Sequence, residues 1–167
     1  MLDSYARMAE KNARDLFSVF DRIVELYGCE RLKTMGDVYL AVSGLPELNP
    51  DHAANIAKVA LRMRRCVERR NLAHPEAWRG RIGIHSGPII GSVVSVQKHV
   101  YDIFGPGANL ASRMQTLAEP MPIVVSPDTY ALLRDDFSCR VLIEVEVKGF
   151  GSQVIYALEG EATSRFG

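Results

Sequence analysis

Six polar residues lie where the sequence predicts turns and strand ends, the positions at which binding and catalytic groups commonly occur. In chain order they are Lys33, Asp37, Asp102, Asn109, Arg113 and Lys148. Lys33 and Asp37 flank a tight Gly-Asp turn, and Asn109 and Arg113 are four residues apart, which places them on one helix face. Together these side chains offer positive and negative charge, amide groups and several hydrogen-bond donors.

Taken singly, each residue also has a plain structural interpretation. These interpretations are a turn former for Asp37, a solvated strand residue for Lys33, a helix cap for Asn109, a surface charge for Arg113 and a hairpin flank for Lys148. The chain contains no GxxxxGK[ST] phosphate loop, GxGxxG, GxSxG or HExxH motif. His85, in the segment GIHSG, is predicted to be a packed or rim residue rather than a metal ligand.

The first half of the chain predicts a helix, a hairpin and a second helix. Apolar residues recur at three- and four-residue steps as far as Tyr27, which predicts a helix from about Asp3 that ends at Gly28. Residues 31–42 predict a hairpin around Gly36-Asp37. A second helix is expected to begin near Asp51 or Asn49 and to continue past Cys66.

The second half predicts two more hairpins and short helices. The expected elements are strands 79–85 and 89–94 around Ser86-Gly87-Pro88, a helix over 109–117, a strand over 123–125, a helix opened by Ser126-Pro127, and an antiparallel pair over 141–147 and 154–158. Strands that alternate with helices but are joined by tight turns favour an α+β fold, with an antiparallel-rich sheet and helices packed on one face.

Composition narrows the function classes. The 167 residues suit one domain, and 20 basic against 20 acidic residues leave no net charge, which argues against nucleic-acid or polybasic membrane partners. The five arginines of LRMRRCVERR are therefore interpreted as a solvated helix face. Three scattered cysteines predict reduced thiols and a cytoplasmic location, and no apolar run approaches the ~18 residues of a membrane span.

Four segments occur in an order that resembles the class III nucleotide cyclases. They are KTMGDVYLAVSGLPE, GRIGIHSGPIIG, YDIFGPGANLASRMQ and VKGFG, and the resemblance extends roughly from Leu16 to Leu158. It implies a ferredoxin-like catalytic domain over residues 1–160. The residues after the last predicted strand, 161–167, are expected to form a disordered tail. It also implies head-to-tail pairing with a second copy, with the active sites in the groove between the two.

The resemblance implies an adenylate cyclase of signal transduction, which converts ATP to cyclic AMP and pyrophosphate with two Mg²⁺ or Mn²⁺ ions. The attack by the ribose 3′-oxygen on the α-phosphate benefits from metal ions and from an arginine that stabilises the developing charge. The implied roles are metal binding for Asp37, adenine recognition for Lys33 and Asp102, ribose positioning for Asn109, transition-state stabilisation for Arg113, and triphosphate binding for Arg81 and Lys148.

Lys33 and Asp102 favour ATP over GTP. A lysine can donate to an adenine ring nitrogen and an aspartate can accept from the exocyclic amine, whereas guanine presents the opposite pattern at those edges. At the positions of Lys33 and Asp102, guanylate cyclases of the family typically carry a glutamate and a cysteine or similar residue. In the implied dimer, Asp37 and Arg81 come from one copy, and the other five residues come from its partner.

One family feature is expected to be missing from this chain. The family's first metal aspartate lies on an N-terminal strand, close to F-x-D-I-x-G-F-T, whereas this chain is predicted to begin inside the following helix. Asp3 is judged too close to Asp37, so one carboxylate ligand and the first strand are expected to be absent. Three explanations remain open: a fragment of an active cyclase, a catalytically silent nucleotide-binding or dimerisation domain, or a sheet completed by another chain.

Overall fold

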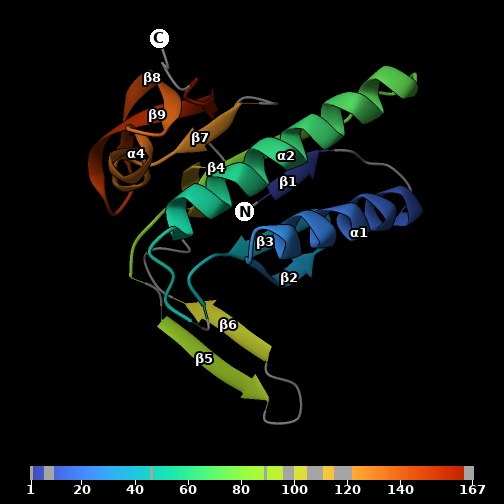
Figure 1. Cartoon of the computed structure of the whole chain (residues 1–167), viewed down its shortest axis with the longest axis horizontal. Helices are drawn as coiled ribbons and strands as arrows, with labels where there is room; N and C mark the ends of the chain where they lie inside the picture. Colours follow the sequence, from blue (N-terminus) through green and yellow to red (C-terminus); the bar gives the residue numbers. More distant parts are fainter. Residues whose placement is uncertain are drawn as a thin grey trace.

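A seven-stranded mixed sheet forms the scaffold of the computed structural model (Figure 1). The structure describes residues 2–5, 10–45, 47–88, 90–95, 100–104, 111–114 and 122–163, and side chains within 14–45, 47–88, 111–114 and 122–163. The strand order is β2-β3-β1-β4-β7-β9-β8, and every neighbouring pair is antiparallel except β4–β7. These strands are β1 (Leu2–Tyr5), β2 (Glu30–Met35), β3 (Val38–Val42), β4 (Arg79–Ile84), β7 (Ile123–Val125), β8 (Phe137–Val147) and β9 (Gly151–Glu161).

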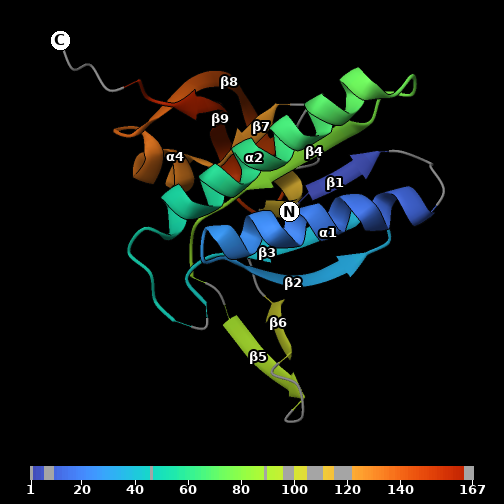
Figure 2. The same cartoon turned by 45° about the vertical axis from the view of Figure 1, so that its right-hand side comes forward.

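Three helices cover one face of the sheet, as Figures 1 and 2 show for the two longest. They are α1 (Glu10–Leu26), α2 (His52–Ala73) and α4 (Pro127–Leu133). Alternation along β7 separates two cores, because Ile123 and Val125 join the helix-side cluster whereas Val124 packs with Met114 on the opposite side. The predicted helices on one face are thus confirmed for these three, but the helical turn 111–114 lies on the other face.

The expectation of a missing first strand is wrong in this structure. Residues 2–5 form β1, not the start of the helix, and α1 begins at Glu10. Strand β1 pairs with β3 on one side and with β4 on the other. Its position satisfies backbone hydrogen-bonding groups of two neighbours that would otherwise form exposed edges inside the sheet.

The predicted hairpin of residues 79–85 with 89–94 is also wrong. Strand β4 pairs with β1 and β7, whereas β5 (Ile90–Ser95) pairs with β6 (Val100–Phe104) in a separate two-stranded sheet. Both edges of β4 are therefore already used. The hairpins β2–β3 and β8–β9 are confirmed, and Gly36 at the first turn has φ 59°, a conformation that glycine adopts without strain. Strand β9 ends at Glu161, and residues 164–167 lie outside the described residues.

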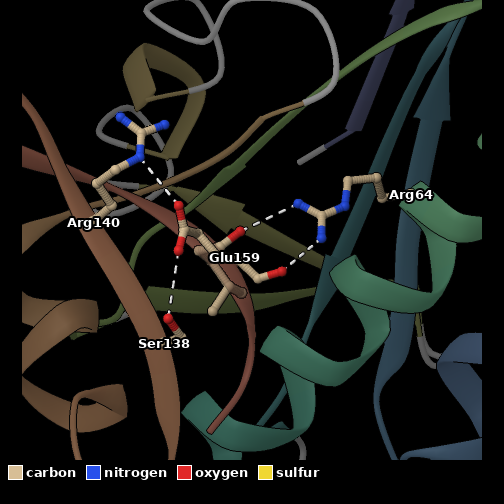
Figure 3. Close-up of polar contacts among 5 residues, drawn as sticks. Arg64, Ser138, Arg140 and Glu159 are labelled. Carbon is tan, nitrogen blue, oxygen red and sulfur yellow. Dashed lines mark hydrogen bonds and ion pairs between the residues drawn. The ribbon is translucent and has the colours of Figure 1, made fainter.

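Arg64 of α2 holds the last strand against the helix layer (Figure 3). Its Nη1 and Nη2 atoms donate to the carbonyl oxygens of Leu158 at 3.3 Å and Glu159 at 2.7 Å. The Glu159 carboxylate accepts from Arg140 Nε at 3.1 Å and from Ser138 Oγ at 3.4 Å. One guanidinium thus fixes the end of β9 relative to α2 through two backbone acceptors.

Asp21 of α1 connects the helix layer to both strands of the β2–β3 hairpin. The Tyr39 hydroxyl donates to Asp21 Oδ1 at 2.7 Å, and Arg31 Nη1 lies 3.2 Å from Asp21 Oδ2. Burial and the hydrogen bond to this carboxylate raise the pKa of Tyr39 well above its ordinary value. The hairpin that carries Lys33 and Asp37 is therefore anchored to the helix layer.

Replacing Asp21 by alanine is expected to lower the free energy of unfolding by about 1–3 kcal/mol, because the buried Tyr39 hydroxyl would lose its acceptor. Urea unfolding measures the change. The matched control is Asp15→Ala, at an exposed position on the same helix, where the expected change is within about 0.5 kcal/mol. Equal stability of Asp21→Ala and Asp15→Ala would contradict the anchoring role.

Candidate active site

Lys33 and Arg81 share the sheet face that lies opposite α1 and α2. Lys33 pairs in register with Leu40, whereas the next residues along β3, Tyr39 and Ala41, pack in the helix-side core. Arg81 likewise alternates with Ile82, which belongs to the helix-side core. Because neighbouring residues of a strand point to opposite faces, both cationic side chains are directed away from the long helices.

A β-bulge at Leu32 produces this orientation of Lys33. Arg31 pairs with Ala41 and contacts Asp21 of α1, so it faces the helices. Without the bulge, Lys33 would share that face, because residues two apart in a strand point the same way. The register shift between Arg31 and Lys33 reverses the alternation. No residue in this segment signals the bulge, so sequence reasoning missed it.

Asp37 lies exposed in the β2–β3 turn, directly before Val38. In register, Asp3 of β1 lies opposite both Val38 of β3 and Arg81 of β4, so these three positions form one row across the sheet. The prediction that Asp3 is too close to Asp37 is therefore corrected, because α1 and β2 separate them along the chain. The side chain of Asp3 lies outside the described ones.

The strand that carries Asp102 lies against the strand that carries Lys33. Residue 102 lies in β6 opposite Ser92 of β5, and β6 contacts β2. Figure 2 shows the β5–β6 hairpin extending below the β2–β3 end of the sheet. The backbone thus brings these two predicted base-recognition positions to one end of the molecule. The Asp102 side chain and the whole of Asn109 lie outside the described parts.

Arg113 and Lys148 lie toward the other half of the sheet. Arg113 is exposed on the turn 111–114, whereas the adjacent Met114 is fully buried against Val124 and Val147. Lys148 is exposed in the β8–β9 turn. In the sheet order, five strands separate β2 from β8, so the structure does not bring Lys148 next to Lys33.

No candidate metal centre is complete among the described side chains: they form no group of three or more His, Cys, Asp or Glu residues.

A cavity of about 520 Å³ lies elsewhere, between α1 and the end of α2, and includes none of the predicted site residues. Within the described parts of the chain, no helix combines the length and apolar character needed to cross a bilayer.

A buried polar network follows β4, and sequence reasoning did not identify it. His85 Nδ1 lies 2.9 Å from Ser126 Oγ, which lies 3.2 Å from Thr129 Oγ1. Thr129 Oγ1 donates to Ser86 Oγ at 3.1 Å. Ser126 also caps α4, as predicted, by accepting from the Thr129 backbone N–H. Burial lowers the pKa of His85 below its ordinary 6.5, and the nearby Asp128 carboxylate opposes that shift.

This lowered pKa predicts loss of stability in mild acid. Below about pH 6.5, the unfolded chain binds a proton at His85 more readily than the folded chain does. The free energy of unfolding therefore decreases as the pH is lowered. Above that value the contribution is fully retained. Urea unfolding between about pH 7.5 and pH 5 should show a shallower fall for His85→Gln than for the wild type. Parallel curves for the two proteins would contradict this prediction, and the exposed His74→Gln provides the control.

Curated relatives include both adenylate and guanylate cyclases. The chain is 37% identical over 150 residues to the receptor-type guanylate cyclase gcy-28 of Caenorhabditis elegans, covering 87% of this chain and 12% of the relative. It is 34% identical over 145 residues to an adenylate cyclase of Mycobacterium bovis, covering 87% of this chain and 33% of the relative. The chain thus spans a third or less of these relatives.

Solved structures show the same architecture. The guanylate cyclase domain of RhGC from Catenaria anguillulae, in complex with GTP, superposes with a TM-score of 0.87 at 29% identity, covering 96% of this chain and 94% of that one. The adenylyl cyclase CyaB from P. aeruginosa shares the fold, with a TM-score of 0.85 at 22% identity and coverage of 99% and 94%. The family model described as "Adenylate and Guanylate cyclase catalytic domain" matches residues 5–160, so this chain belongs to the nucleotide cyclase catalytic domain family.

Proposed function

We propose that the chain is an adenylate cyclase domain that converts ATP to cyclic AMP and pyrophosphate. The observation that carries this choice of nucleotide is the placement of Lys33 on β2, next to the strand that carries Asp102. A cation and a carboxylate at one end of the sheet supply the donor and the acceptor that the adenine edge requires. Overall similarity does not choose between ATP and GTP, because the relatives are of both kinds.

The site is proposed to lie between two copies paired head to tail. The sheet face that carries Lys33 and Arg81 is directed away from the long helices, and we propose that the second copy pairs with this side of the molecule. Lys33 and Lys148 lie at opposite edges of the sheet, and Asp37 lies at the β2–β3 turn. A two-fold axis would bring Asp37 and Arg81 of one copy to Lys33, Asp102, Asn109, Arg113 and Lys148 of the other.

The donor set suits the Mg²⁺ or Mn²⁺ that the family typically uses. Asp37 is an exposed carboxylate, and Asp3 lies opposite Val38, the residue that follows Asp37 in the chain. Magnesium takes oxygen ligands and is commonly bound by one or two carboxylates together with substrate phosphates. We therefore assign Asp37 and Asp3 as the residues that would hold it. When bound, such an ion favours the ionised 3′-oxygen and neutralises phosphate charge.

The remaining residues bind and orient the nucleotide. Arg81 and Lys148 are proposed to hold the triphosphate, and Asn109 to orient the ribose so that its 3′-oxygen faces the α-phosphorus. As the 3′-oxygen forms its bond to phosphorus, the bond from the α-phosphorus to the bridging oxygen breaks, pyrophosphate leaves, and the hydroxyl proton passes to solvent. The Arg113 guanidinium stabilises the negative charge that grows on the α-phosphate oxygens.

Product formation tests the proposal. The chain is incubated with ATP or GTP and Mn²⁺, and cyclic AMP and cyclic GMP are quantified by mass spectrometry, with Asp37→Asn and Asp3→Asn as controls. Cyclic AMP as the main product, lost in Asp37→Asn, is the expected result. Saturable ATP binding without pyrophosphate release would instead identify the catalytically silent alternative. Predominant cyclic GMP would overturn the proposed specificity.

The cytoplasmic location and the domain boundary at residue 160 stay predictions.

A further inference from the structure

The connection between β4 and β5 is held from two sides. On one side the Ser86 hydroxyl accepts a hydrogen bond from Thr129, whose side chain is fully buried. On the other side the Nε2 edge of the His85 ring points at Gly87, since a Cβ atom added there would lie 2.8 Å from His85 Nε2. A contact this short means that a side chain at position 87 would require the His85 ring to move.

The proton positions in this network follow from its contacts. Thr129 uses its hydroxyl proton to donate to Ser86, so Ser126 must donate to Thr129 if their 3.2 Å contact is a hydrogen bond. Ser126 then has no proton left for His85, so His85 Nδ1–H donates to Ser126 at 2.9 Å. The chain of donors thus runs from His85 through Ser126 and Thr129 to Ser86. It fixes the imidazole in one orientation, with its Nε2 edge toward Gly87.

The same connection leads directly into the hairpin of the proposed adenine site. Strand β5 begins at Ile90, three residues after Gly87, and pairs with β6 so that Ser92 lies opposite Asp102. Strand β6 in turn contacts β2, which carries Lys33. The direction in which the chain leaves Gly87 therefore helps to determine where residue 102 lies relative to Lys33.

We infer that His85 is a positioning residue for base recognition: its ring, held by Ser126 and with its Nε2 edge against Gly87, sets the direction of the β5–β6 hairpin. This inference rests on the proposed function, because it assumes that position 102 contacts the base. It assigns His85 no contact with the nucleotide. Its effect is expected on the choice between ATP and GTP and on KM, rather than on the chemical step.

The test compares His85→Ala, His85→Asn and the wild type. His85→Ala is expected to reduce the ratio of kcat/KM for ATP to that for GTP by roughly tenfold or more, mainly through KM, because a misplaced hairpin weakens base contacts. An asparagine amide can donate to Ser126 in place of Nδ1–H, so His85→Asn should restore most of the preference. The exposed His74→Ala is the matched control.

A double-mutant cycle with Gly87→Ala gives a second and sharper test. In the wild type the added methyl group must displace the imidazole and should lower the ATP preference, whereas in His85→Ala it meets no ring and should cause no further loss. Unchanged nucleotide preference in folded His85→Ala, or additive effects in the cycle, would overturn the inference. A merely structural role would lower the melting temperature and the active fraction but not the preference.

Failure of the proposed function would be recognised separately. If the wild type forms no cyclic nucleotide, the adenylate cyclase proposal fails, and the same variants are compared by equilibrium binding of ATP and GTP. A loss of ATP-over-GTP binding preference in His85→Ala, restored in His85→Asn, would still support the positioning role. If the wild type prefers GTP, the expected change is a loss of that preference instead, and an unchanged preference would overturn the inference.

Discussion

Replacing Arg113 by alanine is expected to leave a folded chain that cyclises ATP at least about 100-fold more slowly than the wild type. Removing one preorganised donor to a developing oxyanion typically costs about 10²–10³ in kcat. Arg113 is exposed, and the neighbouring Met114, which is fully buried, holds the turn in place. The substitution should therefore leave stability within about 0.5 kcal/mol of the wild type.

Initial rates of cyclic AMP formation at saturating ATP measure this effect, and urea unfolding confirms the fold. Arg113→Lys keeps the charge but loses the planar fork of donors, so it should recover only part of the rate. The matched control is Arg134→Ala, which removes an exposed arginine after α4, outside the proposed site. Turnover of Arg113→Ala equal to that of this control would exclude Arg113 from the transition state.

The double replacement Lys33→Glu with Asp102→Cys is expected to move the preference from ATP toward GTP. The lysine donor that suits an adenine ring nitrogen becomes an acceptor that suits the guanine N–H groups, and the carboxylate that accepts from the adenine amine is removed. Each mismatched hydrogen bond costs about 1–3 kcal/mol, so the ratio of kcat/KM values should change by about 10²-fold or more.

Parallel kinetics with ATP and GTP measure this ratio for the double variant and for each single replacement. The singles should lose ATP activity without gaining much GTP activity, because each leaves one position matched to adenine. Lys58→Glu, the same charge reversal on α2, should leave the preference unchanged and controls for net charge. An unaltered preference for ATP in the folded double variant would refute the roles of Lys33 and Asp102.

Local signals in the sequence predicted several elements well. The Gly36-Asp37 turn joins β2 and β3 as expected, and Gly36 has the positive φ that such a turn needs. Ser126 and Pro127 open α4 with the predicted cap. These features depend on residues within a few positions of one another, so the sequence itself contains the information that determines them.

Features that depend on distant pairing were not predicted. The local pattern predicts a helix for the residues of strand β1, because the partners of this strand, residues 38–39 and 79–82, are far along the chain. The apparent hairpin of β4 with β5 failed for a similar reason, since the edges of β4 are used by β1 and β7. The bulge at Leu32 is visible only in the register of β2 with β3.

The sequence proposes the candidate site as a set of residues, but it does not predict how they are arranged. The resemblance named Lys33, Arg81 and Arg113, but only the sheet register shows that Lys33 and Arg81 share the face opposite α1 and α2. The contact of His85 with Ser126 joins residues 41 positions apart, so no local motif could indicate it. The role of Ser126 as a helix cap already explains its place in the sequence. Its contact with His85 therefore leaves no separate pattern in the sequence.

The central claim is that two copies of this chain together build the site that cyclises ATP, and mixing two inactive variants tests it most directly. Asp37→Asn and Arg113→Ala are purified, mixed in equal amounts and assayed for cyclic AMP. Roughly half of the dimers are then mixed and hold one intact site of two, so about a quarter of wild-type activity should return, although neither variant is active alone. If both variants fold and pair but the mixture stays inactive, Asp37 and Arg113 do not act across a shared interface, and the proposed dimeric site is wrong.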